Sequence, residues 1–263
     1  MRPRCACLAL GALLGLSSCR QIAGVHDYEL ITDASRHDAD EPPEGEWCAS
    51  LSPQPTFCAD FDAVMTPQEG WDVLQTQAGT TVGLDGELYL SAPDSFLVLV
   101  NDANCNGSAA QLIKGFPSVL THAQLDFEIY SKKYTDVSVA AIQLSSDNSP
   151  VGYLLELYMQ ASGAYFQESV PGDGGATSLY TNFVAPPTSP PWLHVTLVMD
   201  LPNGGPGGTV EVSYNGSTVV THKITASNAY GRPTLHLGAE DAFSAPNGTA
   251  WTGNFDNVTF DLR

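Results

Sequence analysis

The stretch Gln124-Leu125-Asp126-Phe127-Glu128-Ile129-Tyr130 alternates polar and apolar side chains over its whole length. This period of two is that of a β-strand, in which successive side chains point to opposite faces. One face directs large apolar side chains toward a core, and the other directs Asp126 and Glu128 toward water. The stretch therefore predicts a strand of an antiparallel sheet with one solvated face.

The same alternation recurs on the C-terminal side of this stretch, at residues 193–200 and 255–262. Between them, residues 210–224 contain Asn215-Gly216, the dipeptide that best accommodates the positive φ angles of a type I′ hairpin turn. Residues 153–167 predict a second hairpin, and no stretch of similar length has a helical period. About a dozen short strands are expected. The predicted fold is an all-β, two-sheet antiparallel jelly-roll sandwich.

The segments before the sandwich have a different composition. Residues 1–18 begin with two arginines, continue in a short apolar run and end in small residues, which is typical of a signal peptide. The run is too short for a membrane span, which needs about 20 apolar residues. Residues 19–46 are polar and acidic and predict a flexible tether, because they have too little apolar surface to fold. The jelly-roll domain is expected at residues 47–263.

The charge balance limits the possible partners. The chain has 10 Lys and Arg against 29 Asp and Glu, which gives a formal net charge of −19 at pH 7. Nucleic-acid binding is excluded, since it draws its affinity from Lys and Arg on the phosphate backbone. Divalent cations and neutral sugars fit such a surface better.

Three cysteines, Cys48, Cys58 and Cys105, follow the tether. Export favours disulfides, and a bond between Cys48 and Cys58 would close a short loop where the domain begins. Cys58 with Cys105 is the competing pair, and the sequence alone does not decide between them. The spacing of these cysteines argues against a zinc site.

The segment Leu16-Ser17-Ser18-Cys19, which ends the apolar run, resembles the lipobox of bacterial lipoproteins. The resemblance implies that Cys19 is the first mature residue and carries a diacylglyceryl anchor. Arg20 in the next position, in place of Asp, resembles the default sorting to the outer membrane. The alternative is an ordinary secretory signal with a coincidental cysteine.

Motifs along the mature chain resemble, in their order, those of the concanavalin A-like and laminin G-like family. They are Phe57–Asp62, Trp192–Leu197, Tyr214–Gly216, Leu235–Gly238 and Gly253–Phe260. The resemblance implies a structural calcium where the first and last strands meet, with Asp256 as a ligand, and Asp60 and Asp62 lie in the strand expected nearby. Alternatively, Asp256 only makes turn-type hydrogen bonds where a strand begins.

Catalytic signals of this family are not found in the sequence. The Glu-x-Asp-x-x-Glu pattern of its glycoside hydrolases is absent, and we interpret Asp126 and Glu128 as a solvated strand face. Residues 162–167 are faintly similar to the closing motif of alginate lyases, but the Lys of that motif is missing, and Ile142-Gln143-Leu144 supplies no His. The histidines form no catalytic constellation by spacing; they are His122, His194, His222 and His236.

The aromatic residues of the middle strands suggest a binding role, because rings can stack on the apolar faces of sugars. The candidates for a ligand-binding surface are Tyr153, Tyr158, Tyr165, Phe166 and Tyr180, with Trp251 in a rim loop. We therefore predict a lipid-anchored envelope protein whose noncatalytic jelly roll binds a glycan or a surface protein. The alternatives are a polysaccharide-degrading hydrolase or lyase on the same fold and a purely structural domain.

Overall fold

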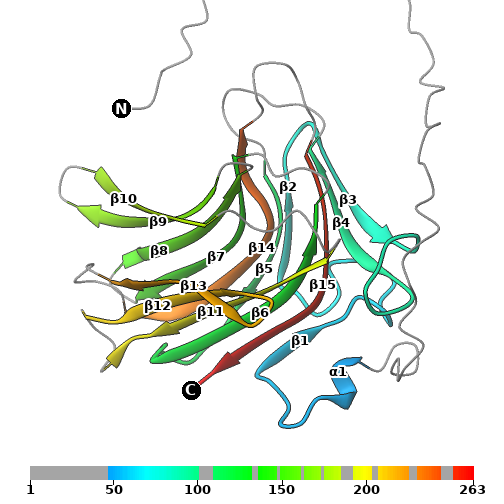
Figure 1. The fold of residues 1–263 in the computed structure, drawn as a ribbon, viewed down its shortest axis with the longest axis horizontal. Helices are drawn as coiled ribbons and strands as arrows, with labels where there is room; N and C mark the ends of the chain where they lie inside the picture. Colours follow the sequence, from blue (N-terminus) through cyan, green and yellow to red (C-terminus); the bar gives the residue numbers. More distant parts are fainter. Residues whose placement is uncertain are drawn as a thin grey trace, which may run out of the picture. The chain divides into compact units, whose positions relative to one another are not determined.

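Two antiparallel sheets packed face to face make up most of the described part of the chain, as predicted (Figure 1). The computed structural model describes residues 47–100, 109–131, 136–146, 149–160, 163–172, 175–184, 192–202, 207–224, 230–243 and 251–263. Within these ranges the helix α1 (Trp47–Ser50) is a single turn, and no helix has the length and apolar character needed to cross a membrane.

The first sheet has eight strands, in the order β13-β12-β11-β6-β15-β4-β3, with β1 paired to β15 beyond the end of β4. Its strands are β1 (Phe57–Ala59), β3 (Thr80–Asp85), β4 (Ser95–Val100), β6 (His122–Tyr130), β11 (Trp192–Asp200), β12 (Thr209–Tyr214), β13 (Ser217–Lys223) and β15 (Trp251–Leu262). The pairing of β1 with β15 brings the first and last strands of the sandwich together, as the family resemblance implied.

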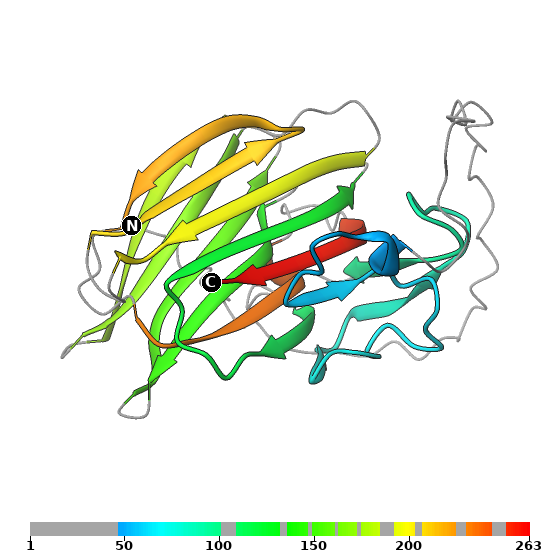
Figure 2. The same cartoon turned by 90° about the horizontal axis from the view of Figure 1, so that it is seen from below.

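The second sheet has seven strands, in the order β10-β9-β8-β7-β14-β5-β2. Its strands are β2 (Val73–Thr76), β5 (Ala110–Gly115), β7 (Asp136–Ser146), β8 (Ser149–Gln160), β9 (Gly163–Gly172), β10 (Gly175–Phe183) and β14 (Arg232–Phe243). Figure 2 shows the two sheets as separate layers, with β11, β12 and β13 in front of the strands of the second sheet. The hairpin predicted for residues 153–167 is confirmed by β8 and β9.

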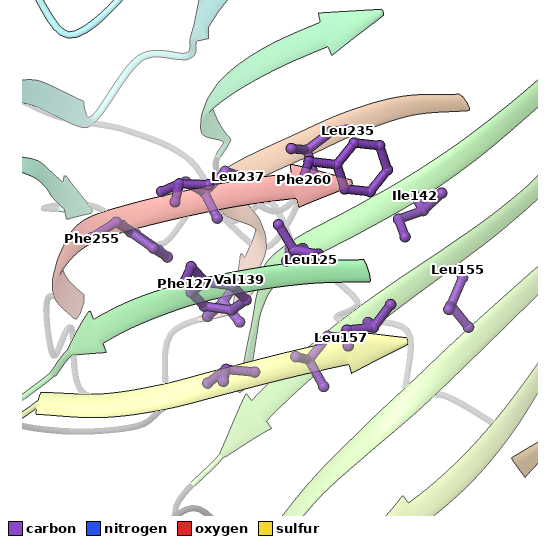
Figure 3. Packing of buried hydrophobic residues seen from close by; sticks show 14 of the residues in the cluster. Leu125, Phe127, Val139, Ile142, Leu155, Leu157, Leu235, Leu237, Phe255 and Phe260 are labelled. Carbon is purple, nitrogen blue, oxygen red and sulfur yellow. The ribbon is translucent and has the colours of Figure 1, made fainter. Parts of the chain in front are cut away.

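The core lies between the layers and is built from the alternating residues of both sheets (Figure 3). In β6, the apolar members Leu125 and Phe127 are fully buried, and they face Leu155 and Leu157 of β8 and their neighbours. Each such side chain contributes about 1.5–3 kcal/mol through the removal of apolar surface from water. The period of two seen in the sequence is therefore the pattern that closes the sandwich.

The tight turn predicted at Asn215-Gly216 joins β12 to β13. Both residues have positive φ angles, 49° for Asn215 and 75° for Gly216, as a type I′ turn requires. The flanking residues Tyr214 and Ser217 are paired directly across the hairpin. This turn is confirmed.

Candidate functional site

The side of the seven-stranded sheet that points away from the core, called here the outer face, carries polar and aromatic side chains in aligned rows. Strand pairing places in one row Ile113, His236, Ala141, Glu156, Gln167 and Tyr180. The next row contains Glu240, Ser138, Tyr158, Tyr165 and Asn182. Because neighbouring strands lie about 4.8 Å apart, the row extends about 20 Å from His236 to Tyr180.

His236 lies in the middle of this face, with 12% of its side chain exposed. Its Nδ1 is 3.2 Å from Oε1 of Gln111, an atom that only accepts, so the tautomer that satisfies this contact has its proton on Nδ1. Nε2 is then the acceptor, and within the described residues it is buried without a hydrogen-bond partner. Burial lowers the pKa of His236 to about 4, so the imidazole is neutral at pH 7.

The local backbone places a carboxylate beside this histidine. The Cα atoms of residues four apart in an unbroken strand are separated by about 13 Å. The side chains of His236 and Glu240 nevertheless meet, with Oε2 of Glu240 3.9 Å from Nδ1 of His236. The register of β14 shifts between Leu237 and Glu240, and Gly238 in this bulge has a φ of 137°. A Cβ at Gly238 would lie 2.3 Å from the carbonyl oxygen of Ala110, so only glycine fits.

The tyrosines of this face form a stacked group. The rings of Tyr158 and Tyr165 are parallel to within 6°, with centroids 4.6 Å apart, and Tyr180 meets the edge of Tyr165 at 5.9 Å. The Tyr158 hydroxyl donates to Oε1 of Glu156 at 3.0 Å, and the Tyr165 hydroxyl donates to Oδ1 of Asp136 at 2.7 Å. Tyr180 is 49% exposed and is the predicted aromatic residue that offers a ring to solvent.

Several aromatic residues predicted as ligand-binding have no exposed ring, and the prediction is wrong for them as surface platforms. Tyr158 and Phe166 are fully buried, and Tyr165 is nearly so. Tyr153 is buried on the core side, where its hydroxyl donates to Oε1 of Glu168 at 2.7 Å. Trp251 does not lie in a rim loop: it begins β15 and packs its ring in the core. The alternation of these aromatic residues with polar ones indicated a strand. It did not indicate whether each ring faces the core or the outer face.

The outer face of the eight-stranded sheet holds a second polar group, which corrects two predictions. Asp126 and Glu128 are not a free solvated face, because His194 from β11 lies between them. Its Nδ1 is 2.9 Å from Oε1 of Glu128, and its Nε2 is 3.5 Å from Oδ1 of Asp126. The hydrogen bonds to Asp126 and Glu128 raise the pKa of His194 to about 10, so this histidine is a cation and does belong to a constellation.

Asp256, predicted as a calcium ligand, is buried where β15 meets the segment before β4. Its Oδ2 accepts the backbone N–H groups of Leu90 and Ser91 at 2.8 and 3.0 Å. Its Oδ1 accepts the N–H of Asn257 at 2.8 Å, and it lies 3.2 Å from the Ser91 hydroxyl, which donates to Oδ1 of Asn257 at 2.8 Å. Three backbone N–H donors thus occupy the two oxygens, which fits the alternative prediction of strand-start hydrogen bonds. Burial raises the pKa of Asp256 to about 7.

Asp60 and Asp62, the acidic residues expected near Asp256, also act as hydrogen-bond acceptors. Asp60 accepts the N–H of Cys48 at 3.0 Å, and Asp62 accepts the N–H of Asp94 at 3.3 Å. Across the described ranges, no group of three or more His, Cys, Asp or Glu side chains is arranged to hold a metal ion.

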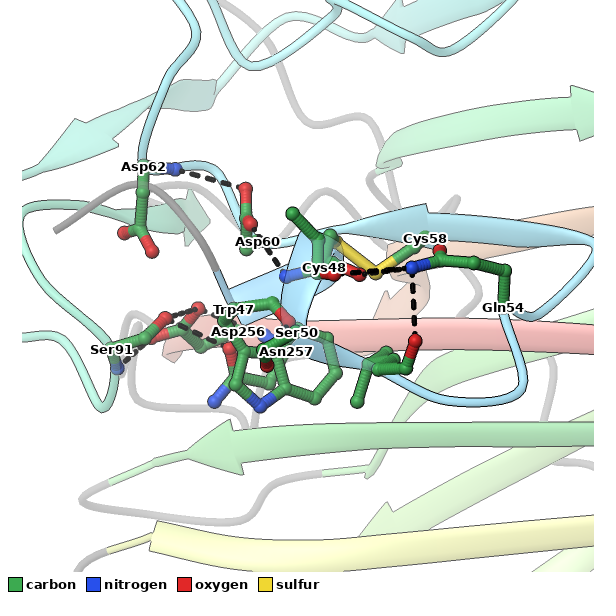
Figure 4. The surroundings of a disulfide bond; sticks show 12 residues. Trp47, Cys48, Ser50, Gln54, Cys58, Asp60, Asp62, Ser91, Asp256 and Asn257 are labelled. Carbon is green, nitrogen blue, oxygen red and sulfur yellow. Dashed lines mark hydrogen bonds between the residues drawn. A yellow bond between two sulfur atoms is a disulfide. The ribbon is translucent and has the colours of Figure 1, made fainter. Parts of the chain in front are cut away.

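Cys48 and Cys58 form a disulfide with their Cα atoms 5.8 Å apart, so the competing pair with Cys105 is wrong (Figure 4). Inside the closed loop, the amide of Gln54 donates to the carbonyls of Cys48, Ala49 and Leu51. The loop is therefore fixed both covalently and by hydrogen bonds. The predicted lipid site Cys19 lies outside the described residues, as does Cys105.

Comparison with known proteins gives a fold but no sequence family, since no protein-family model and no curated protein matches the chain. An endo-β-1,4-glucuronan lyase from the fungus Trichoderma reesei has a TM-score of 0.61 at 10% identity, over 80% of this chain and 96% of that one. A glycoside hydrolase family 16 endo-glucanase from Bacteroides ovatus has a TM-score of 0.55 at 11% identity, over 78% and 99%. The cellulose induced protein Cip1 has a TM-score of 0.56 at 15% identity, over 78% and 96%. The chain therefore has the jelly-roll fold of such proteins, consistent with a concanavalin A-like domain.

Proposed function

We propose that the protein cleaves a polysaccharide that lies across the outer face of the seven-stranded sheet. Among the solved structures that share its fold are a glucuronan lyase and an endo-glucanase, which makes a glycan the best-supported substrate class. The aligned row from His236 to Tyr180 supplies an imidazole, a carboxylate, an amide and a half-exposed ring. Its length of about 20 Å suits a short stretch of glycan chain.

The observation that carries this proposal is the state of His236. Its imidazole is neutral, its Nδ1 proton is directed at Gln111, and its buried Nε2 has no partner within the described residues. Such a nitrogen can accept a proton from water or from a sugar carbon. The nearby carboxylate of Glu240 would stabilise the imidazolium that forms.

The position of Glu156 relative to His236 suggests which residue acts as the acid and which as the base. Glu156 lies two strands from His236 in the same row, with the small Ala141 between them. Their backbones are therefore about 10 Å apart, a separation close to that between the acid and the base of inverting glycosidases. We assign His236 as the base and Glu156 as the acid in hydrolysis of a neutral glycan, because the acidic chain repels polyuronates.

The test is incubation of the purified full-length chain with neutral glucans and with polyuronates. New reducing ends measure hydrolysis, and the ultraviolet absorbance of unsaturated products measures elimination. We expect reducing ends from a neutral glucan and a loss of about 100-fold or more in rate for His236→Asn, the range of general-base catalysis. His122→Asn, which alters a histidine of the other sheet with 27% of its side chain exposed, is the matched control. Absence of product from every glycan would overturn the proposal.

A second candidate function is retention of the glycan without cleavage. It is favoured by the recess beside His236, which is lined by Gln111, Ser138, Ala141 and Glu240 and is too narrow to hold a water molecule. In this case Tyr180, the half-exposed ring, would supply most of the contact. Tyr180→Ala would then weaken retention in affinity electrophoresis while no wild-type product is released.

We also propose that the chain works at the bacterial envelope, anchored through a diacylglyceryl group on Cys19. The lipobox-like segment that ends at Cys19 supports this placement. Labelling with a fatty acid in a diderm bacterial host should mark the wild-type chain and not Cys19→Ala. An unlabelled wild-type chain recovered from the soluble fraction would contradict the anchor.

A further inference from the structure

A cavity of about 350 Å³ lies on the other side of the molecule, between the disulfide-closed segment and the outer face of the eight-stranded sheet. One wall is apolar and comes from Trp47, Leu51, Pro53 and Pro55, and the floor is polar and comes from Asp126, Glu128, His194, Asn257 and Thr259. Its size falls at the lower end of the range for small-molecule sites, about 300–1,000 Å³. It shares no residue with the row proposed for cleavage.

The floor is held in place before any ligand binds. The Thr196 hydroxyl donates to Oδ1 of Asp126 at 2.6 Å, and the amide of Gln124 donates to its Oδ2 at 2.7 Å. His194 binds Glu128 through Nδ1, which leaves Oε2 of Glu128 as an acceptor for a ligand hydroxyl. The carboxylates are 17–19% exposed and His194 is 38% exposed, so the group can be reached from solvent.

The side-chain amide of Asn257, a hydrogen-bond donor, lies beside these acceptors because of a bulge in β15. The register shifts between Asp256 and Thr259, and Asn257 in this bulge has a φ of 49°, which asparagine tolerates better than most residues. Its Oδ1 accepts the Ser91 hydroxyl at 2.8 Å, so the amide is oriented and its N–H groups remain to donate. The floor therefore offers both donors and acceptors at fixed positions.

The apolar wall is equally fixed. The disulfide between Cys48 and Cys58, the three hydrogen bonds of the Gln54 amide and the bond from Cys48 N–H to Asp60 tie the segment to the sandwich (Figure 4). Trp47 begins α1 in this segment and lines the cavity with its half-buried side chain. An indole opposite a hydrogen-bonding floor suits a flat ring with apolar faces and polar edges.

We propose that this cavity is a second glycan site, which binds one or two units of an uncharged sugar. The sugar ring stacks on Trp47, its hydroxyls donate to Glu128 and accept from Asn257, and no bond is made or broken. Two carboxylates against one imidazolium leave the floor with one net negative charge, which rejects uronates, sulfates and phosphates. The site holds a glycan on the face opposite to the proposed cleavage row.

The experiment titrates the full-length chain with cellobiose and with glucuronate, using calorimetry and saturation-transfer NMR. We expect cellobiose to bind in the millimolar range, with magnetisation transferred to its ring protons, and glucuronate not to bind. Trp47→Ala should weaken binding about tenfold or more, whereas Trp47→Phe keeps a ring and should retain most of it. Glu128→Gln should weaken binding about tenfold, because it removes a charged acceptor.

Two controls separate this site from other effects. Asp200→Asn alters a carboxylate that pairs with His122 on the same two strands but lies outside the cavity, and it should leave binding unchanged. His236→Asn should abolish cleavage and leave cellobiose binding here intact, so the two proposals fail independently. Preferential binding of glucuronate, no binding of either sugar, or binding that Trp47→Ala does not weaken in a folded protein would overturn this inference.

Discussion

His194 and His236 occupy comparable positions on the two outer faces of one sandwich, and their surroundings give them opposite protonation states. His194 lies between two carboxylates, and the pKa of its side chain is raised to about 10. His236 is enclosed by the sheet, and burial lowers the pKa of its side chain to about 4. The first is a cation that organises a polar floor, and the second is a neutral nitrogen that can accept a proton.

Cross-strand neighbours explain this difference. In the eight-stranded sheet, His194 is paired directly with Glu128, and Thr196 is paired with Asp126. In the seven-stranded sheet, His236 is flanked by Ile113 and Ala141, which provide no charge and exclude water. The residues paired across the strands therefore contribute to whether desolvation or ion pairing dominates the pKa of a histidine on such a face; at His236 desolvation dominates, although Glu240 lies 3.9 Å away.

The largest expected effect comes from the bulge that holds His236 against Glu240. Gly238→Ala forces a Cβ to within 2.3 Å of the Ala110 carbonyl and strains a φ of 137°, so we expect a loss of about 3 kcal/mol or more in the free energy of unfolding. Gly83→Ala, in β3, is the control, because a Cβ there meets nothing within 4 Å. Urea denaturation of both variants measures the difference. Equal stability of the two would show that the bulge imposes no such constraint.

The second effect is the dependence of stability on pH at His236. Its pKa is about 4 in the folded protein and about 6.5 when unfolded, so its contribution is present above pH 6.5 and is lost as the pH falls toward 4. We expect a decrease of about 1–3 kcal/mol over this range relative to His236→Asn. Denaturation series at pH 7, 5.5 and 4 for both proteins measure it. A parallel decrease in the two proteins would assign the pH effect to other groups.

His194 should show the opposite dependence, with a smaller amplitude. Its pKa is raised from 6.5 to about 10, so its contribution is complete below pH 6.5 and is lost as the pH rises toward 10. Because the side chain is 38% exposed, solvent screening reduces this contribution to about 1 kcal/mol. The same series from pH 6 to pH 10, compared with His194→Gln, isolates the effect. If the free energy of unfolding of His194→Gln changes with pH as much as that of the wild type, the ion pairs do not stabilise the fold.

The sequence predicted the strands well because each strand encodes its own period. Residues 124–130 show this, since every apolar member of the pattern is buried in β6. The Asn215-Gly216 turn was predicted for the same reason: positive φ is a local requirement. The disulfide was predicted only as one of two possible pairs, because the pairing depends on which cysteines the fold brings close together.

The candidate sites were harder to predict because they are made by pairing between distant strands. Nothing local to His194 shows that β11 lies beside β6, and without that pairing Asp126 and Glu128 have the pattern of a solvated face. His236 is similar, because its state depends on Gln111 from another strand and on a bulge at Gly238. Tyr153 and Tyr158 lie on opposite faces of one strand, so their ring chemistry alone did not distinguish core from surface.

The smallest expected effect concerns calcium at Asp256, where both carboxylate oxygens already accept backbone hydrogen bonds. A bound cation would have to displace these donors, so millimolar Ca²⁺ or EDTA should leave the thermal unfolding midpoint unchanged. Asp256→Asn should lower the midpoint equally with and without Ca²⁺, since an amide loses acceptor capacity on one side. An upward shift with Ca²⁺ that Asp256→Asn abolishes would show ligand-linked stabilisation and reverse this assignment. Then Asp256 would resemble His194, whose charge is compensated by opposite charges, and would no longer be a carboxylate compensated by backbone donors alone.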